Sequence, residues 1–209
     1  KLFGWLIPVN DTQYDYLYSS RSVIKNQYYN KTKSSGFYGC DVWGEADKVL
    51  KPYLQKGMTI YAEIVGFTPN GGYIQKGYDY GCIPPKEGDV YQYGIHFKIF
   101  IYRITLTNVD GNVHEFSARE VQQWCINNGL ISVNQYYYGY AANLYPHLDV
   151  MNNWSENFLK ELVNDKDFYM ECDSPTCNNK VPHEGLVIKV ENMKSEAFKL
   201  KCFAFLDKE

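Results

Sequence analysis

The feature that most constrains the fold of this chain is its last segment, where two strand-like runs stand close together. The runs are EGLVIKVEN and EAFKLKCFAF, and Met193-Lys194-Ser195 separates them. In both, β-branched and aromatic residues mix with polar ones, as is typical of half-buried β-strands. Strands joined by so short a connection pair antiparallel. The sequence therefore predicts a β-hairpin at this end of the chain.

Further strands are expected upstream. The first forty residues alternate apolar and polar positions around a turn signal at Pro8-Val9-Asn10-Asp11, which predicts a hairpin with its second strand at residues 14–24. MTIYAEIVGF is typical of a buried strand, and HFKIFIYRITLT predicts another that turns at Asp110-Gly111 into residues 112–116. The 20 tyrosines fit a β-rich protein.

Helical signals lie between these strands. Apolar residues recur at helical spacing from Glu45 to Lys56, and Gly57 stands where a helix would stop. Ser117 with Glu120 forms a capping-box pattern for a helix that ends before Gly129, and another helix is expected over residues 155–163. Antiparallel strands with interspersed helices indicate an α+β fold, which we expect to form one domain over residues 1–209.

Composition limits the function classes. No run approaches eighteen apolar residues and the start KLFGWLIPVN lacks the zones of a signal peptide, so we expect a soluble, cytoplasmic protein without a membrane partner. A formal net charge of −3 argues against a protein that coats nucleic acid through bulk charge. The six cysteines are expected to be reduced thiols, and the C-x4-C of Cys172 and Cys177 lacks the second pair of ligands that zinc needs.

The final hairpin carries a candidate site. Lys199 and Lys201 are two apart on a strand, so both ammonium groups leave the same face. Glu184 and Lys189 bracket the apolar part of the partner strand and add a carboxylate and another cation near that face. Lysines bind phosphate as point charges and a carboxylate can hold Mg²⁺. The commoner explanation of a K-x-K pattern, a solvated strand face, stays open.

Together these residues resemble a known family. E-G-L-V-I-K followed by F-K-L-K is similar to motifs IV and V of the covalent nucleotidyltransferases, the superfamily of ATP-dependent ligases and mRNA capping enzymes. Upstream, Tyr61 to Gly66 resembles motif III and Phe97 to Ile104 resembles motif IIIa. Ser20-Arg21 looks like motif Ia, so the motifs run in the family's order over residues 21–201.

The resemblance implies roles for these residues. Glu63 would contact the ribose, and Tyr102, or Phe100 as the alternate, would stack on the adenine. Arg21 would lie near the nucleotide or the RNA end. Lys189, Lys199 and Lys201 would bind phosphates, with Glu184 in the metal region. For each aromatic, packing alone is an equally good reading.

The nucleophilic lysine of this family stands in K-x-x-G ahead of motif Ia. Lys1-Leu2-Phe3-Gly4 is the one such pattern at that position, and its distance to Arg21 suits the family, although Phe3 replaces the usual polar residue. A lysine upstream of Lys1 is the rival, and we expect the 1–209 core to be truncated at both ends.

The resemblance implies an ATP-grasp-like nucleotidyltransferase fold and an ATP-dependent RNA ligase. Such an enzyme joins RNA 5′-phosphate and 3′-hydroxyl ends through lysyl-AMP and adenylated RNA, with ATP and Mg²⁺ as cofactors. A DNA ligase, an mRNA guanylyltransferase that uses GTP, and a non-catalytic nucleotide- or RNA-binding module remain alternatives.

Overall fold

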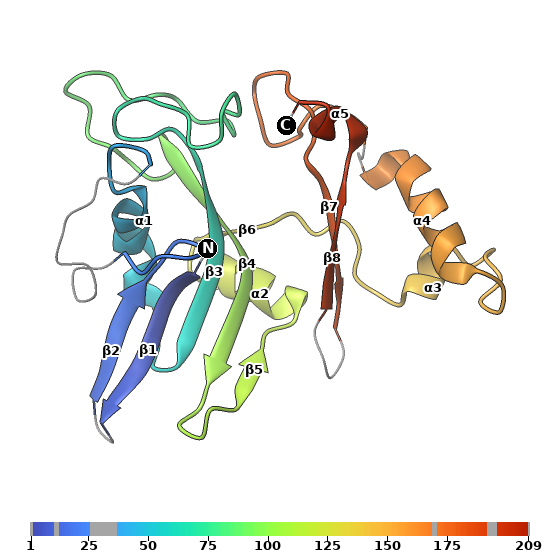
Figure 1. The fold of residues 1–209 in the computed structure, drawn as a ribbon, viewed down its shortest axis with the longest axis horizontal. Helices are drawn as coiled ribbons and strands as arrows, with labels where there is room; N and C mark the ends of the chain where they lie inside the picture. Colours follow the sequence, from blue (N-terminus) through green and yellow to red (C-terminus); the bar gives the residue numbers. More distant parts are fainter. Residues whose placement is uncertain (1, 11–12, 26–36, 169–170, 192–195, 209) are drawn as a thin grey trace. The chain divides into compact units, whose positions relative to one another are not determined.

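The chain divides into two compact units, Lys1–Val133 (unit 1) and Asn134–Glu209 (unit 2), which are described separately. The computed structural model describes residues 2–10, 13–25, 37–168, 171–191 and 196–208 (Figure 1). Unit 1 contains β1 (Leu2–Asn10), β2 (Gln13–Tyr18), α1 (Val42–Leu50), the 3₁₀ turn η1 (Lys51–Tyr53), β3 (Met58–Gly66), β4 (Phe97–Thr107), β5 (Val113–Glu115), α2 (Ala118–Asn127) and β6 (Ile131–Ser132). Unit 2 contains α3 (Ala141–Leu144), α4 (Trp154–Asn164), η2 (Lys166–Phe168), β7 (Gly185–Val190), β8 (Glu196–Lys201) and α5 (Phe203–Leu206).

The sheet of unit 1 has the strand order β2-β1-β3-β4-β5, and β6 pairs with β4. The pairs along this order are antiparallel, whereas β4 and β6 are parallel. The β1–β2 hairpin and the two long central strands agree with the sequence predictions. The expected α+β class of helices with antiparallel sheets is confirmed at this level.

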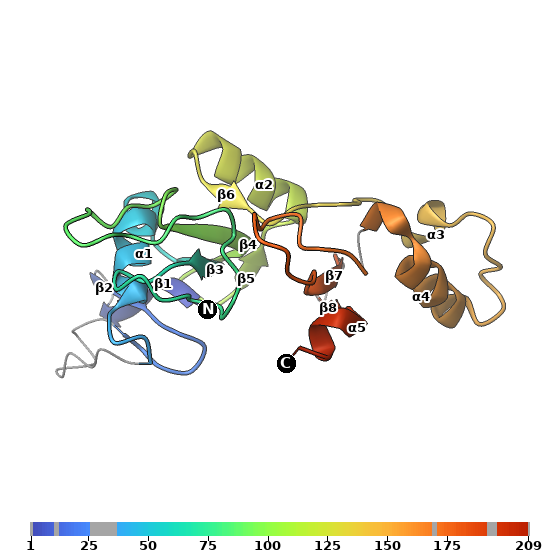
Figure 2. The ribbon, with the colours of Figure 1, turned by 90° about the horizontal axis from the view of Figure 1, so that it is seen from above.

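Two helices cover one face of the unit 1 sheet. Every second residue of β3, namely Met58, Ile60, Ala62 and Ile64, is buried there with Ile99, Ile101 and Ile104 of β4. The same core includes Val42, Ala46 and Leu50 of α1 and Val121 and Cys125 of α2. Figure 2 shows α2 beside β4 and β6. Burial of apolar area at roughly 25 cal/mol per Å² makes this layer the main source of stability in unit 1.

The first helix differs from the sequence prediction of Glu45 to Lys56. It begins earlier because the Asp41 side chain caps it, accepting a hydrogen bond from the Gly44 backbone N–H at 3.0 Å. It ends at Leu50, since Pro52 lacks an N–H and its ring clashes with a preceding carbonyl inside a helix. The second strand, predicted at residues 14–24, is also shorter in the structure, where β2 spans Gln13–Tyr18.

The connection between β3 and β4, residues 67–96, is long and irregular, and the structure describes all of it without a helix or strand. Hydrogen bonds hold it in place at both ends. The Phe67 N–H donates to the His96 carbonyl at 2.9 Å, and the Tyr91 hydroxyl donates to the Phe67 carbonyl at 2.6 Å. Tyr78 and Cys82 are buried within it. Long ordered loops of this kind are commonly functional.

Unit 2 contains a two-stranded ribbon and a short helical segment. In the ribbon, β7 and β8 pair antiparallel in regular register from Gly185–Lys201 to Val190–Glu196, which confirms the predicted hairpin (Figure 1). The helix expected at residues 155–163 is α4, which is one residue longer at each end. Its Phe158 packs on Trp154 and Tyr145, with ring centroids 4.9 and 5.3 Å away.

Two further findings concern membrane-spanning helices and the cysteines. Within the described ranges, no helix is long and apolar enough to cross a membrane. All six cysteines are free thiols.

Candidate functional site

One partly exposed patch of unit 1 gathers three of the predicted nucleotide residues, Glu63, Phe100 and Tyr102. Glu63 of β3 stands directly opposite Phe100 of β4, and the neighbouring pairs on the same side are Tyr61–Arg103 and Val65–Lys98. These positions alternate with the core residues, so their side chains leave the sheet on the side away from α1 and α2. We call Tyr61, Glu63, Lys98, Phe100, Tyr102 and Arg103 the Glu63 face.

Alternation from Phe100 places Tyr102 on this face, and a β-bulge next to Tyr102 puts Arg103 there as well. Tyr61 pairs with Arg103 and the next residue, Ala62, pairs with Ile101, so Tyr102 is the extra residue on β4. Its ring centroid lies 6.4 Å from that of Tyr61. Burial raises the pKa of the Tyr102 hydroxyl, and the nearby Glu63 carboxylate raises it further. Tyr102 therefore stays protonated at neutral pH and can donate a hydrogen bond.

Arg103 closes one end of the Glu63 face. Its guanidinium carbon lies 4.6 Å from the centroid of the Tyr61 ring, and its Nη2 donates to Glu115 Oε2 at 2.7 Å. Burial would by itself lower the pKa of Arg103, but the hydrogen bond and charge of Glu115 raise it on balance. The arrangement supplies a cation over the Tyr61 ring, with the tilted ring of Tyr102 and a carboxylate on the same face.

The second cluster lies in unit 2, on one face of the β7–β8 ribbon. Lys201 stands opposite Gly185, Lys199 opposite Val187, and Lys189 opposite Ala197. Directly opposed residues share a face of a ribbon, so the three lysines share one, as Lys199 and Lys201 were predicted to do. We call Lys189, Lys199, Lys201 and Glu184 the lysine face.

The cations of the lysine face have partners. The Lys199 ammonium donates to Glu184 Oε1 in an ion pair, both side chains being partly exposed. Lys201 Nζ lies 5.0 Å from the centroid of the Phe205 ring. Gly185 allows the close strand approach here, since its φ is +124° and a Cβ would lie 2.0 Å from the Leu200 carbonyl oxygen. The charge of Lys199 is therefore offset by Glu184.

Glu184 is the predicted metal residue. Across the ranges that the structure covers, no group of three or more His, Cys, Asp or Glu side chains could hold a metal ion. One carboxylate is nevertheless enough for a Mg²⁺ ion that takes its other ligands from substrate phosphates and water. Within the same ranges, Cys172 and Cys177 belong to no group of potential metal ligands.

Arg21 and Lys1 are the two remaining predicted residues. Arg21 is exposed in a tight turn, where the Ser20 backbone N–H donates to the Val23 carbonyl at 2.9 Å. Lys1 lies outside the described residues. Its neighbour Leu2 begins β1 and pairs with Tyr61 of the Glu63 face.

Sequence reasoning missed Tyr61, Arg103 and Tyr80. Tyr61 is two residues before Glu63, so strand alternation would have placed it on the same face. Arg103 could not be found this way, because the bulge at Tyr102 shifts the alternation. Tyr80 comes from the β3–β4 connection, and its ring centroid lies 6.4 Å from that of Phe100.

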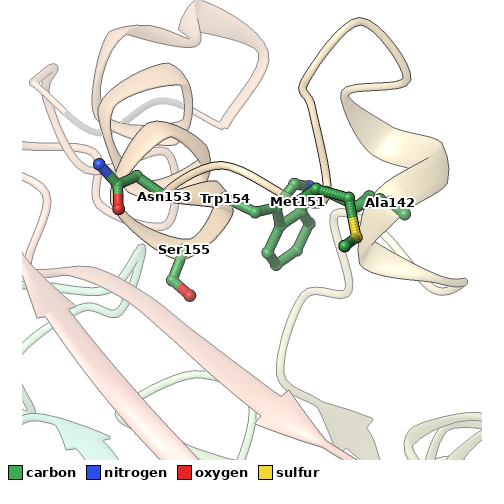
Figure 3. A pocket seen from close by; sticks show the side chains of 6 residues that line it. Ala142, Met151, Asn153, Trp154 and Ser155 are labelled. Carbon is green, nitrogen blue, oxygen red and sulfur yellow. The ribbon is translucent and has the colours of Figure 1, made fainter.

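A shallow pocket of about 520 Å³ is also present in unit 2, at the start of α4. Figure 3 shows Met151 and Trp154 at this pocket. It is lined by Ala142, Val150, Met151, Asn153, Trp154 and Ser155. None of these lining residues is a predicted site residue, and none of them carries a charge.

Comparisons with known proteins add no assignment: no family model, no curated protein and no solved structure matches the chain.

Proposed function

We propose that the chain is an ATP-dependent RNA ligase with a nucleotidyltransferase fold, acting in the cytoplasm on RNA 5′-phosphate and 3′-hydroxyl ends. The observation that carries the proposal is the Glu63 face. Glu63 directly opposes Phe100, and Tyr102 lies beside it with Tyr61. A carboxylate accepts hydrogen bonds from ribose hydroxyls, and aromatic rings stack on a purine.

The lysine face supports the same proposal through its charge. Adenylation forms a bond between a lysine Nζ and the α-phosphorus of ATP and breaks the bond to the bridging oxygen, so that pyrophosphate leaves. Negative charge builds on the phosphate oxygens during this step. Lys199 and Lys201, fixed on one ribbon face, would stabilise that charge. Mg²⁺ held by Glu184 and phosphate oxygens would neutralise the departing pyrophosphate.

Two further transfers complete the reaction. A 5′-phosphate oxygen of RNA attacks the α-phosphorus of lysyl-AMP and the lysine amine leaves, giving adenylated RNA. The RNA 3′-hydroxyl then loses its proton and attacks the 5′-phosphorus, and AMP leaves. The nucleophile must be a neutral amine, and Lys1 remains the predicted one. Arg21 is proposed to bind the RNA end.

Labelling of the protein tests the proposal. Incubation with ATP labelled at the α-phosphate and Mg²⁺ should leave AMP on the protein through denaturing electrophoresis. Lys201→Ala and Lys199→Ala should each lower the labelling rate about 100-fold or more, because each removes a preorganised charge partner of the α-phosphate. Lys180→Ala, an exposed lysine of unit 2 outside the ribbon, is the matched control and should label like the wild type.

The other possible outcomes would assign a different function to the chain. Labelling by GTP instead of ATP would assign a guanylyltransferase, and joining of nicked DNA in preference to RNA would assign a DNA ligase. ATP binding without labelling, unchanged by Lys1→Ala, would identify a non-catalytic nucleotide-binding module. If the chain neither labels nor binds nucleotide, the proposal is wrong.

A further inference from the structure

Tyr80 has a backbone conformation that tyrosine rarely adopts. Its φ is +50° and that of Gly81 is +66°, and the Cys82 N–H donates to the Asp79 carbonyl at 2.9 Å across the pair. Two left-handed central residues closed in this way characterise the type I′ turn, in which the first position favours Asn, Asp or Gly. Tyrosine is disfavoured there because its Cβ crowds the backbone.

Several contacts hold Tyr80 in this conformation. The Lys98 ammonium donates to the Tyr80 carbonyl at 2.8 Å, and the Tyr80 hydroxyl donates to Gln75 Oε1. Its ring centroid lies 6.4 Å from that of Phe100. Lys98 and Phe100 both belong to the Glu63 face, so the turn is tied to the rim of that face. A disfavoured backbone that is held by so many contacts is a common property of functional sites.

Core packing alone does not explain why residue 80 is a tyrosine. Tyr78, two residues earlier, is 4% exposed and already serves as the buried aromatic of this part of the loop, with its ring 6.0 Å from Tyr80. Tyr80 keeps part of its surface exposed next to Phe100. Tyr80 is therefore half-buried beside Phe100, the residue directly opposite Glu63, and an aromatic ligand ring can stack at this position.

We propose that Tyr80 is a base-binding residue of the nucleotide site, and that its ring extends the stacking surface of Phe100 on the loop side of Glu63. The inference rests on the proposed function and adds a contact that the strands alone do not supply. It also gives a role to the ordered β3–β4 connection, which presents Tyr80 through the turn at Asp79–Cys82.

Equilibrium binding to the whole chain tests this inference. The probes are ATP with Mg²⁺ and ribose 5-triphosphate with Mg²⁺, which lacks the base. Tyr80→Ala should raise the Kd for ATP about tenfold, since a base–aromatic stack is worth roughly that factor, and leave the Kd for ribose 5-triphosphate unchanged. Tyr80→Phe, which keeps the ring, should bind ATP within about twofold of the wild type.

Tyr73→Ala is the matched control, because Tyr73 is an exposed tyrosine of the same loop whose ring packs on Phe67 instead. It should bind ATP like the wild type, and circular dichroism should show all variants folded. Equal ATP affinity of wild type and Tyr80→Ala, or an equal loss for both probes, would overturn the inference.

The variant Glu63→Gln distinguishes a failure of the Tyr80 inference from a failure of the proposed function. If the wild type binds ATP and Glu63→Gln weakens it while Tyr80→Ala does not, only the role of Tyr80 is wrong. If the wild type binds neither ATP nor GTP, the proposed function and the inference fall together.

Discussion

At the scale of single residues, Asp47 of α1 has a carboxyl group whose charged form is destabilised by burial. Its Oδ1 is buried and has no hydrogen-bond partner. Burial raises the pKa of this carboxyl from its ordinary 3.8 to about 6, and the Lys51 ammonium one turn later only partly opposes the shift. The ionised form is therefore disfavoured in the folded protein relative to the unfolded chain.

This pKa shift predicts a pH dependence of stability. The folded state binds the proton more tightly, so the free energy of unfolding should fall as pH rises from about 4 to about 6 and then level off. Asp47→Asn should remove that fall and be about 1 kcal/mol more stable than the wild type at pH 7.5, a value reduced for solvent screening of a half-exposed group. Urea unfolding at pH 4.5 and 7.5 measures both.

The control is Glu45→Gln on the same helix, which removes a carboxylate whose ion pair with Lys48 is exposed. It should keep the pH dependence of the wild type. An Asp47→Asn variant that is less stable than the wild type at pH 7.5 would show that Asp47 has a favourable partner in solution.

At the scale of elements, α2 is a helix whose start is determined by local sequence. Ser117 accepts a hydrogen bond from the Glu120 N–H at 3.2 Å, and Glu120 accepts one from the Ser117 N–H at 2.7 Å. This reciprocal capping box was predicted from the sequence and is confirmed. The hydrogen bond from the backbone lowers the pKa of Glu120, as expected for a carboxylate that is stabilised in its charged form.

Removing the cap should therefore destabilise unit 1. Ser117→Ala is expected to lower the free energy of unfolding by about 1 kcal/mol, because the Glu120 backbone N–H loses its side-chain acceptor. Urea denaturation followed at 222 nm measures the change. Ser155→Ala, in the first turn of α4, is the control, since α4 has no side-chain cap bond at Asn153, and it should change stability by less than about 0.5 kcal/mol.

At the scale of the whole molecule, each unit has its own packed residues. The largest core lies entirely in unit 1, between the β3–β4 layer and helices α1 and α2. In unit 2, buried residues occur in α4, at the start of β7 and in α5, among them Phe158, Leu162, Leu186 and Phe205. A two-stranded ribbon is only marginally stable by itself, so unit 2 depends on these flanking contacts.

A fragment of residues 1–133 should consequently fold without unit 2. Its unfolding should be cooperative, because the fragment keeps the complete sheet and both covering helices. Thermal unfolding followed by circular dichroism and the dispersion of its amide proton resonances measure this. A fragment that gives only the narrow amide dispersion of an unfolded chain would show that unit 1 requires unit 2.

Local sequence determined much of the fold. The capping box of α2, the β7–β8 hairpin and the strands β3 and β4 follow from patterns that span only a few residues. Their bounds agree with the structure within two residues, except that the predicted strand run EAFKLKCFAF ends as β8 at Lys201 and its last residues belong to α5. Local patterns failed where a stronger short-range effect intervened, as at Pro52, which ends α1 early. They also missed β6, whose two residues carry no periodic signal.

The candidate site was predictable only in part. Alternation along β8 put Lys199 and Lys201 on one face by sequence alone, because successive strand residues point to opposite sides. Tertiary structure decided the rest: the register that sets Glu63 opposite Phe100, the bulge that brings Arg103 opposite Tyr61, and the turn that brings Tyr80 to Phe100. Register between strands far apart in the chain is fixed by which residues fill the shared core, and no local pattern contains that information.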